Sequence, residues 1–278
     1  GPHTAKNMCS GSYNIALGDC AMEGSGTFSD ATAKCNLAFG KSALRKISSG
    51  CMNIAMGDNA GCSLTTGHSN VMIGNSAGTS LTSGNQNNVF IGTDAGRAST
   101  DSQGNTFIGC RAGCEFVSGT TNVIIGETSG VKIGTADEAI GVVVVGGTNL
   151  VESTSAGCMV IIGRQAAYRG TDHRNSIIMG FCTAYGVTGC TGGTSNIVMG
   201  TDAMKCNQTG CYNFLFGNCA GKLISTGGHN VFVGGYAGCS IGAGGCNVFL
   251  GKDAGKSVTT GSNLIAIGCG ALSAEDTN

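Results

Sequence analysis

The side chains of this sequence that could carry chemistry are its cysteines, histidines and acidic residues. The 278 residues include 16 Cys, 4 His and 16 Asp plus Glu. Zinc ribbons need cysteines in Cys-x-x-Cys spacing, and the sequence has no such pair. A catalytic site needs a nucleophile, a base and an acid close together, but here these residues are scattered among glycine-rich segments. We therefore expect no metal site, no cofactor and no enzymatic activity.

The cysteines leave two interpretations open. They lie near expected turns, where a small thiol side chain fits partly buried positions. Disulfides are the alternative, and two pairs lie at nearly the same corner of adjacent repeats: Cys35 with Cys51, and Cys190 with Cys211. Free thiols would fit assembly in a reducing cytoplasm, and the sequence does not decide between the two states.

A repeated five-residue word, Asn followed by three apolar residues and Gly, organises these residues. Counting substituted forms, it occurs fifteen times, and ten of the fourteen spacings are 17 residues. The copies begin at Asn14, Asn36, Asn53, Asn70, Asn88, Asn105, Asn122, Val142, Met159, Ser176, Asn196, Asn213, Asn230, Asn247 and Leu264. We number the repeat from this first residue, so that Gly is always at position five, and Ala is at position eight in twelve copies.

A 17-residue period predicts a β-solenoid. It is too short for a pair of helices, and the apolar triplets are rich in β-branched and aromatic residues that favour strands. Glycines punctuate each repeat as turns. We expect an all-β parallel β-solenoid, or β-roll, of about fifteen coils, roughly 70 Å long at ~4.8 Å per coil. In this scheme residues 4–278 form one domain, irregular at 127–195, and residues 1–3 are an expression-tag scar.

The composition excludes several other classes. Charged residues make up 11 % and the net charge is −1, so neither a disordered linker nor a nucleic-acid-binding face is expected. The apolar runs are far shorter than the ~20 residues of a membrane-spanning helix. We therefore expect no nucleic-acid partner and no membrane insertion.

The position-one asparagines are expected to form a structural ladder, each amide bonding to the next coil or to turn backbone. The ladder residues are Asn53, Asn70, Asn88, Asn105, Asn122, Asn196, Asn213, Asn230 and Asn247.

The apolar triplet suggests an oligomer. Side chains alternate between the two faces of a strand, so positions two and four are expected to point into the coil and position three outward. An outward stripe of this size would be covered, and three copies of the chain around one axis would cover it. The expected homotrimer interface consists of Met72, Phe90, Phe107, Ile124, Val144, Ile161, Ile178, Val198, Leu215, Phe232 and Phe249.

The repeat word resembles the head repeats of trimeric autotransporter adhesins and the repeats of phage and large-virus fibre proteins. Residues 88–96 and 247–255 carry the resemblance most clearly, and it spans 14–272. It implies three left-handed β-rolls about one axis, at a virion or extracellular surface, attached to a host receptor that is a glycan or a protein. The 17-residue coil is longer than the adhesin coil, which favours the viral-fibre branch, whereas the many cysteines are unusual for both groups.

The irregular region 127–195 holds the candidate receptor contacts, because repeat proteins often bind through departures from their repeat. Exposed Tyr and Arg suit binding hot spots, although neutral variation on a surface turn explains them equally well. The candidates are Arg164, Tyr168, Arg169, Asp172, His173, Arg174 and Tyr185. The alternative function is a monomeric ice-binding or surface-adsorbing solenoid, suggested by an interrupted column of threonines such as Thr66, Thr226 and Thr260.

Overall fold

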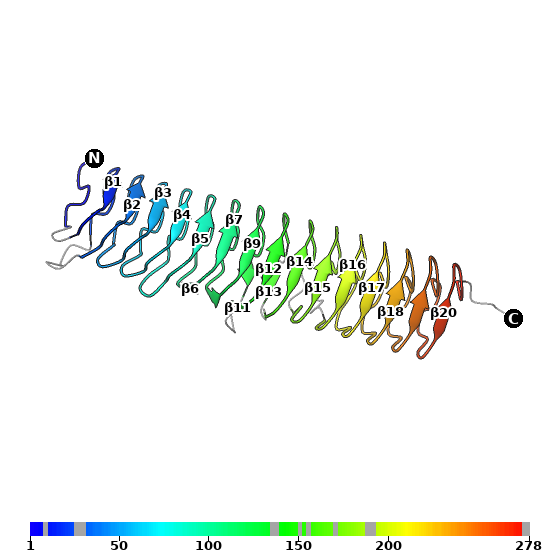
Figure 1. Ribbon diagram of the computed structural model, residues 1–278. Helices are drawn as coiled ribbons and strands as arrows, with labels where there is room; N and C mark the ends of the chain where they lie inside the picture. The colour runs from blue at the N-terminus through cyan, green and yellow to red at the C-terminus, as the bar shows by residue number, and fades with distance from the viewer. Residues whose placement is uncertain are drawn as a thin grey trace. The chain divides into compact units, whose positions relative to one another are not determined.

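The computed structural model describes residues 1–7, 11–24, 32–133, 139–149, 152–153, 157–168, 172–186 and 193–273. The chain forms two compact units, Gly1–Gly141 and Val142–Asn278. Within each unit the described residues contain strands and turns but no helix, and successive coils stack one after another (Figure 1). The expected all-β parallel solenoid is confirmed. Of the residues singled out above, Arg169 and Cys190 lie outside the described part.

The first unit is built on a parallel sheet of three-residue strands. Adjacent strands pair residue for residue; for example, Phe90 of β5 lies opposite Phe107 of β7. The sheet order is β1 (Ile15–Leu17), β2 (Leu37–Phe39), β3 (Ile54–Met56), β4 (Val71–Ile73), β5 (Val89–Ile91), β7 (Thr106–Ile108) and β9 (Val123–Ile125). A smaller parallel sheet joins β6 (Asp101–Gln103), β8 (Ser118–Thr120) and β11 (Ala139–Ile140), and β10 covers Lys132–Ile133.

The second unit repeats this architecture. Its parallel sheet again places equivalent triplet residues opposite each other, as with Phe232 and Phe249. The order is β12 (Val143–Val145), β14 (Val160–Ile162), β15 (Ile177–Met179), β16 (Ile197–Met199), β17 (Phe214–Phe216), β18 (Val231–Val233), β19 (Val248–Leu250) and β20 (Ile265–Ile267). The short strand β13 covers Glu152–Ser153.

The glycine at position five is required for two reasons. Gly109 has a φ of +132°, in a region that residues with a side chain rarely adopt. A Cβ atom on Gly109 would also meet the carbonyl oxygen of Gly126 in the next coil at 2.6 Å. The corner after each strand therefore needs both the backbone freedom and the small size of glycine.

The structure reverses the expected direction of the triplet side chains. Position three points into the coil, and its residues in β2 to β20 have at most 3 % of their surface exposed. Phe90, Phe107, Phe232 and Phe249 are among the largest fully buried side chains. The prediction that position three forms an oligomer interface is therefore wrong. Its members, from Met72 to Phe249 as named above, form the core of the unit to which each belongs and are buried within their own chain.

Position nine explains how these core side chains fit. A Cβ on Gly113 would lie 2.8 Å from the ring of Phe107, so the large ring at position three needs glycine at position nine. Where position three is the small Ala38, position nine is Leu44, and both are fully buried. In these two coils the volumes of positions three and nine compensate each other, which keeps the interior close-packed. In the coil that follows, Ala55 and Gly61 are both small, and the side chains of Leu44 and Met72 from the adjacent coils lie against Gly61.

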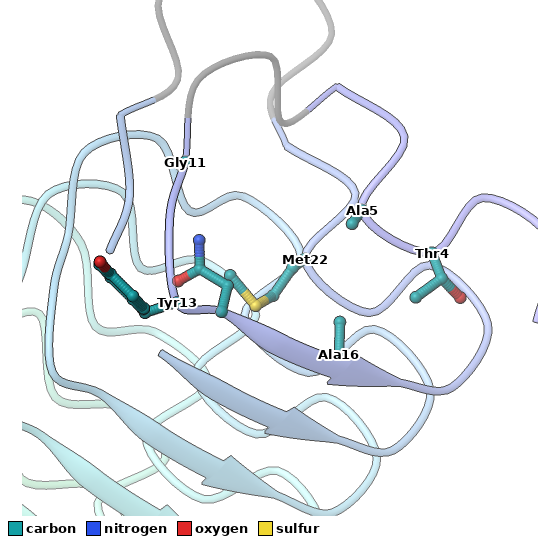
Figure 2. Close-up of a pocket in the computed structure, with 7 residues that line it drawn as sticks. Thr4, Ala5, Gly11, Tyr13, Ala16 and Met22 are labelled. Atoms are coloured by element: carbon teal, nitrogen blue, oxygen red, sulfur yellow. The ribbon is translucent and has the colours of Figure 1, made fainter. Parts of the chain in front are cut away.

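Residues 1–7 form the turn half of a coil. The carbonyl of Pro2 accepts a hydrogen bond from the backbone N–H of Cys20 at 3.2 Å, and Ala5 N–H donates to the Ala21 carbonyl at 2.9 Å. Later coils make the same bonds, as between Asn59 N–H and the Lys41 carbonyl. Residues 1–3, interpreted from sequence as a tag scar, are thus hydrogen-bonded in the repeat register. Beside them, a cavity opens at the end of the first unit (Figure 2).

Candidate functional site

The predicted asparagine ladder is present, and both the oxygen and the amide of its side chains are hydrogen-bonded. The side-chain oxygen of Asn36 accepts both the backbone N–H and the side-chain amide of Asn53, each at 2.9 Å. The amide of Asn53 also donates to the Gly67 carbonyl at 2.8 Å within its own coil. Because the ladder asparagines are almost fully buried, each of these bonds replaces one otherwise made to water. The ladder is structural and also includes Asn14 and Asn36.

The ladder changes where position one is not Asn. Ser176 partly replaces it, since its hydroxyl accepts the backbone N–H of Asn196 at 3.1 Å. Beside β20, the backbone N–H of Leu264 donates to the side-chain oxygen of Asn247 at 2.9 Å. The Leu264 side chain has no oxygen that could accept a hydrogen bond from a further coil. The asparagine ladder therefore ends at Leu264.

Positions two and four form the outer strand face of each unit, which the sequence analysis assigned to the interior. Its exposure is substantial: Phe216 is 51 % exposed and Met56 40 %. In the first unit the face consists of Ile15, Leu17, Leu37, Phe39, Ile54, Met56, Val71, Ile73, Val89, Ile91, Thr106, Ile108, Val123 and Ile125. In the second unit it consists of Val143, Val145, Val160, Ile162, Ile177, Met179, Ile197, Met199, Phe214, Phe216, Val231, Val233, Val248, Leu250, Ile265 and Ile267.

This outer strand face is almost uninterrupted. Thr106 is the one residue of the set that is not apolar. Parallel sheets are normally covered on both faces, and a strand buried on both faces has a continuous apolar sequence, as these triplets have. A flat apolar face on every main-sheet strand of a unit is typical of an interaction surface.

The structure places the candidate receptor residues in different surroundings. Tyr168 and Tyr185 lie at the same repeat position in successive coils, and their rings stack with centroids 5.1 Å apart. The ammonium group of Lys205, one coil further on, lies 6.0 Å from the centroid of the Tyr185 ring. Arg164 is exposed in the same unit. The tyrosines and Lys205 thus form an aromatic and cationic ridge that the sequence analysis identified only in part.

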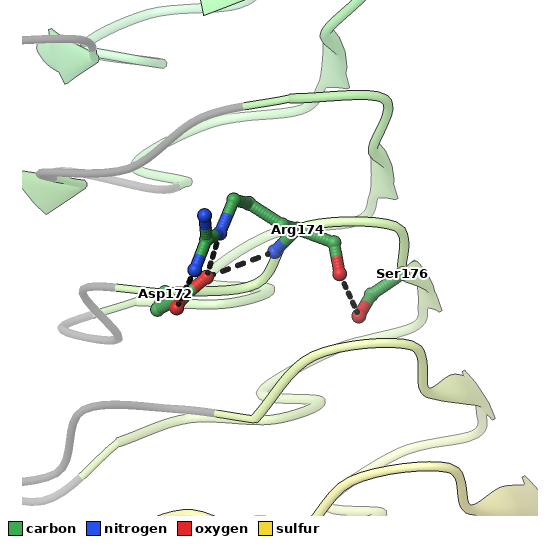
Figure 3. Close-up of polar contacts among 3 residues, drawn as sticks. All are labelled: Asp172, Arg174 and Ser176. Atoms are coloured by element: carbon green, nitrogen blue, oxygen red, sulfur yellow. Dashed lines mark hydrogen bonds and ion pairs between the residues drawn. The ribbon is translucent and has the colours of Figure 1, made fainter. Parts of the chain in front are cut away.

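Asp172 and Arg174 form an ion pair (Figure 3). Two guanidinium nitrogens of Arg174 donate to the two carboxylate oxygens at 3.0 and 2.9 Å, and the Arg174 backbone N–H adds a third bond at 3.3 Å. Partial burial raises the pKa of Asp172, but the hydrogen bonds from Arg174 outweigh it, and the net pKa is lowered. Ser176 donates to the Arg174 carbonyl at 3.3 Å, which fixes the corner before β15.

His173 is not a surface residue. It is only 2 % exposed, and its Nε2 atom has no hydrogen-bond partner. It occupies position fifteen of a coil whose first position is Met159 rather than Asn. Burial lowers the pKa of His173 to about 4, against the opposing charge of Asp172. The prediction that His173 contacts a receptor is therefore wrong, because its ring is enclosed by its own chain.

The fourteen described cysteines carry free thiols. Cys35 and Cys51, a predicted disulfide candidate, are both free, and Cys211 is free as well. Exposed thiols are Cys35, Cys110, Cys158, Cys246 and Cys269, and buried ones are Cys62, Cys114, Cys182 and Cys219. Within the described residues, no group of three or more His, Cys, Asp or Glu is placed to hold a metal ion.

The described part of the chain holds no helix able to span a lipid bilayer. Comparison with protein-family models, curated proteins and solved structures finds no match to this chain.

Proposed function

We propose that this protein is a segment of a homotrimeric fibre or adhesin at a virion or cell surface, that it attaches to a host receptor and that it has no catalytic role. The observation that carries the proposal is the outer strand face, which is apolar along every main-sheet strand of each unit except at Thr106. Three chains packed through this face would remove it from water, and burying apolar surface drives association.

The size of the face fits such an interface. Eight three-residue strands at about 4.8 Å spacing cover roughly 350 Å² in the second unit, and the first unit adds a similar area. Each of these faces is thus somewhat under half of the about 800 Å² that each partner contributes to a standard interface. The resemblance to trimeric fibre repeats supports the same arrangement, with positions two and four, rather than position three, in contact.

Receptor attachment is proposed for the ridge of Tyr168, Tyr185 and Lys205, with Arg164 nearby. Tyrosine gives a large contact area at little entropic cost. The Lys205 ammonium group, which pairs with Asp202 at 3.0 Å, adds a polar contact beside the Tyr185 ring. Arg174 and Asp172 hold each other and shape the adjacent corner. Screening the protein on immobilised glycans and host-surface proteins, with Tyr168→Ala and Tyr185→Ala as matched variants, tests this assignment. Binding that both variants retain in full would place the receptor site elsewhere.

Molar mass in solution tests the oligomer. A trimer gives about 83 kDa, three times the 27.6 kDa of one chain, with and without reductant. Phe216→Ser on the outer strand face should lower the mass toward one chain. Leu223→Ser is the matched control, since Leu223 is 44 % exposed but lies in a turn of the same coil. A wild-type mass of one chain would contradict the trimer.

A monomer would favour the alternative of an ice-binding or surface-adsorbing solenoid. That alternative predicts thermal hysteresis at high protein concentration. A trimer without thermal hysteresis would leave only the fibre proposal.

A further inference from the structure

One corner of the second unit gathers its lysines, which lie at positions six and ten of their coils. The turns of successive coils stack there. The backbone N–H of Leu223 donates to the Cys239 carbonyl at 3.0 Å, and that of Ser240 donates to the Lys256 carbonyl at 3.2 Å. The side chains at position ten therefore form one line, which we call the position-ten column. Its members, coil by coil, are Tyr168, Tyr185, Lys205, Lys222, Cys239 and Lys256.

Two lysines of the column are held by aspartates at position seven of their own coils. The Lys205 ammonium group lies 3.0 Å from the Asp202 carboxylate, and that of Lys256 lies 3.1 Å from the Asp253 carboxylate. Between residues 181 and 257 these two aspartates stand against four lysines. The corner therefore keeps an excess of positive charge.

The excess charge is centred on Lys222. Position seven of its coil is Cys219 rather than an aspartate, and among the described residues no carboxylate pairs with the Lys222 ammonium group. Burial and the nearby Cys219 thiol raise the pKa of the Cys239 thiol, whereas the charges of Lys222 and Lys256 oppose this rise. Cys239 is thus a neutral thiol in the column, with an ammonium group on either side of it.

Tyrosine rings lie beside these cations. Tyr236, at position seven and 40 % exposed, has the Lys256 ammonium group 5.1 Å from its ring centroid. Lys205 lies 6.0 Å from the Tyr185 ring centroid in the same way. Cations, carboxylates and aromatic rings therefore alternate along one line that advances by about 4.8 Å per coil.

This combination of groups suits a chain of acidic sugars. Negative groups of a sugar pair with the ammonium groups, sugar hydroxyls donate to the carboxylates of Asp202 and Asp253, and the apolar faces of sugar rings pack on tyrosine. Lysine binds as a point charge and suits a sulfate, whereas arginine suits the planar carboxylate. A nucleic acid fits less well, because the two carboxylates would repel its closely spaced phosphates.

We propose that the position-ten column, with Asp202, Tyr236 and Asp253 beside it, binds a linear sulfated glycan. The sulfates pair with Lys222 and Lys256 on either side of Cys239, and the chain of sugars continues along the column toward Tyr185 and Tyr168. This assignment rests on the receptor attachment proposed above, and it names the chemical class of the receptor.

Calorimetric titration of the full chain with a heparin dodecasaccharide tests the proposal. Lys222→Gln and Lys256→Gln should each weaken binding by about threefold or more, and the double variant by about tenfold. Lys222→Arg keeps the charge and should keep most of the affinity. Lys46→Gln is the matched control, because it removes the same charge from an exposed site in the first unit and should leave the affinity nearly unchanged.

Cys239 reports where the glycan lies. Its thiol is partly exposed, and its alkylation by iodoacetamide should slow when the dodecasaccharide is bound, whereas exposed Cys110 in the first unit should react at the same rate. Cys239→Ser should retain binding, since the thiol itself is not needed. Cys239→Glu places a carboxylate between the two lysines and should weaken binding as much as the double lysine variant does.

Equal affinity for a desulfated dodecasaccharide, or equal weakening by Lys46→Gln and Lys222→Gln, would overturn the proposal. So would a DNA oligonucleotide that binds the same lysines as tightly as heparin, because the site would then not select a glycan. Attachment to immobilised host proteins without any heparin binding would refute the sulfated glycan alone and leave receptor attachment standing.

Discussion

The ring of Phe107 lies directly over Gly113, so closely that a Cβ atom on Gly113 would lie 2.8 Å from the ring. The same relationship joins Phe90 to Gly96, where the distance would be 2.6 Å. It shows that position three of the triplet is the inner position and that position nine lies directly against it.

The inner and outer triplet positions should respond differently to substitution. Phe232 is fully buried and stacks on Phe249 with ring centroids 4.8 Å apart. Phe232→Ala should lower the free energy of unfolding by about 3–5 kcal/mol because it leaves a cavity. Phe216→Ser on the outer strand face should change stability of the isolated chain much less but reduce association. Chemical denaturation combined with light scattering measures both, and equal loss of stability would contradict the assignment of faces.

Replacing a ladder asparagine by aspartate should be strongly destabilising. The side-chain amide of Asn88 donates to the side-chain oxygen of Asn70 and to the Ser102 carbonyl oxygen. In Asn88→Asp both donated bonds are lost, and a carboxylate oxygen faces these two oxygen atoms instead. A buried group without its partners costs about 1–3 kcal/mol, more when charged. Asn218→Asp is the control, since Asn218 is exposed. Thermal unfolding should separate the two variants, and a similar Tm would show that the ladder is dispensable.

Two adjacent glycines allow a matched test of the corner. Gly234 has a φ of +137°, and its Cβ would meet the Gly251 carbonyl carbon at 2.5 Å, whereas a Cβ on Gly235 would meet nothing within 4 Å. We expect Gly234→Ala to cost about 3 kcal/mol or more, from backbone strain and the clash. Gly235→Ala should stay within about 0.5 kcal/mol of wild type. Urea denaturation of both variants gives the comparison directly.

Acidification should destabilise the second unit through His173. Its pKa in the folded chain is about 4, mainly because of burial, while the ordinary value is 6.5. Between these values the unfolded chain binds more protons than the folded one, so stability falls as pH drops from 6.5 toward 4. The Asp172 pKa is also lowered, and its contribution is lost only below its ordinary value of 3.8.

The measurement is Tm between pH 7 and 4 for wild type, His173→Gln and His229→Gln. The His173 variant should lose much of the pH dependence in this range, and the variant of exposed His229 should retain it. A wild-type Tm that does not change between pH 6.5 and 4 would contradict the buried neutral histidine.

Thiol labelling should follow burial. Cys35, Cys110, Cys158, Cys246 and Cys269 are exposed and should react with a maleimide in the native protein. Cys62, Cys114, Cys182 and Cys219 should react only after unfolding, and burial also raises the pKa of the Cys182 thiol, which lowers its thiolate fraction. Peptide mapping by mass spectrometry resolves each site. Rapid labelling of Cys114 would show that the coil interior opens readily.

Much of the fold was predictable from residue types at fixed spacing. The word beginning at Asn88 specifies a strand through Val89, Phe90 and Ile91, and a corner through Gly92. Its Asn makes the interstrand bonds expected of a ladder. These features are local or involve the next coil at the same position, so periodicity alone defines them.

The sequence alone did not determine which face of the triplet is buried. Val89 and Ile91 point to one face of the strand and Phe90 to the other, and all three are apolar. Hydrophobicity therefore does not show which of the two faces is buried in the coil. The compensation between position three and position nine, as in Ala38 with Leu44 or Phe107 with Gly113, carried that information in the sequence. Only the folded coil, by bringing positions six residues apart into contact, shows that these two positions share one interior.

The tertiary structure also decided the place of His173 and the ridge. The sequence put His173 among exposed turn residues, but its coil lacks Asn at position one, and the ring is buried in that coil. Parallel coils place equivalent positions side by side, and this brings the Tyr168 ring onto Tyr185 and the Lys205 ammonium group near the Tyr185 ring. The repeat period of the sequence thus determines the strands and the asparagine ladder of this protein. Only the packing of side chains within each coil determines which of them are buried and which are exposed.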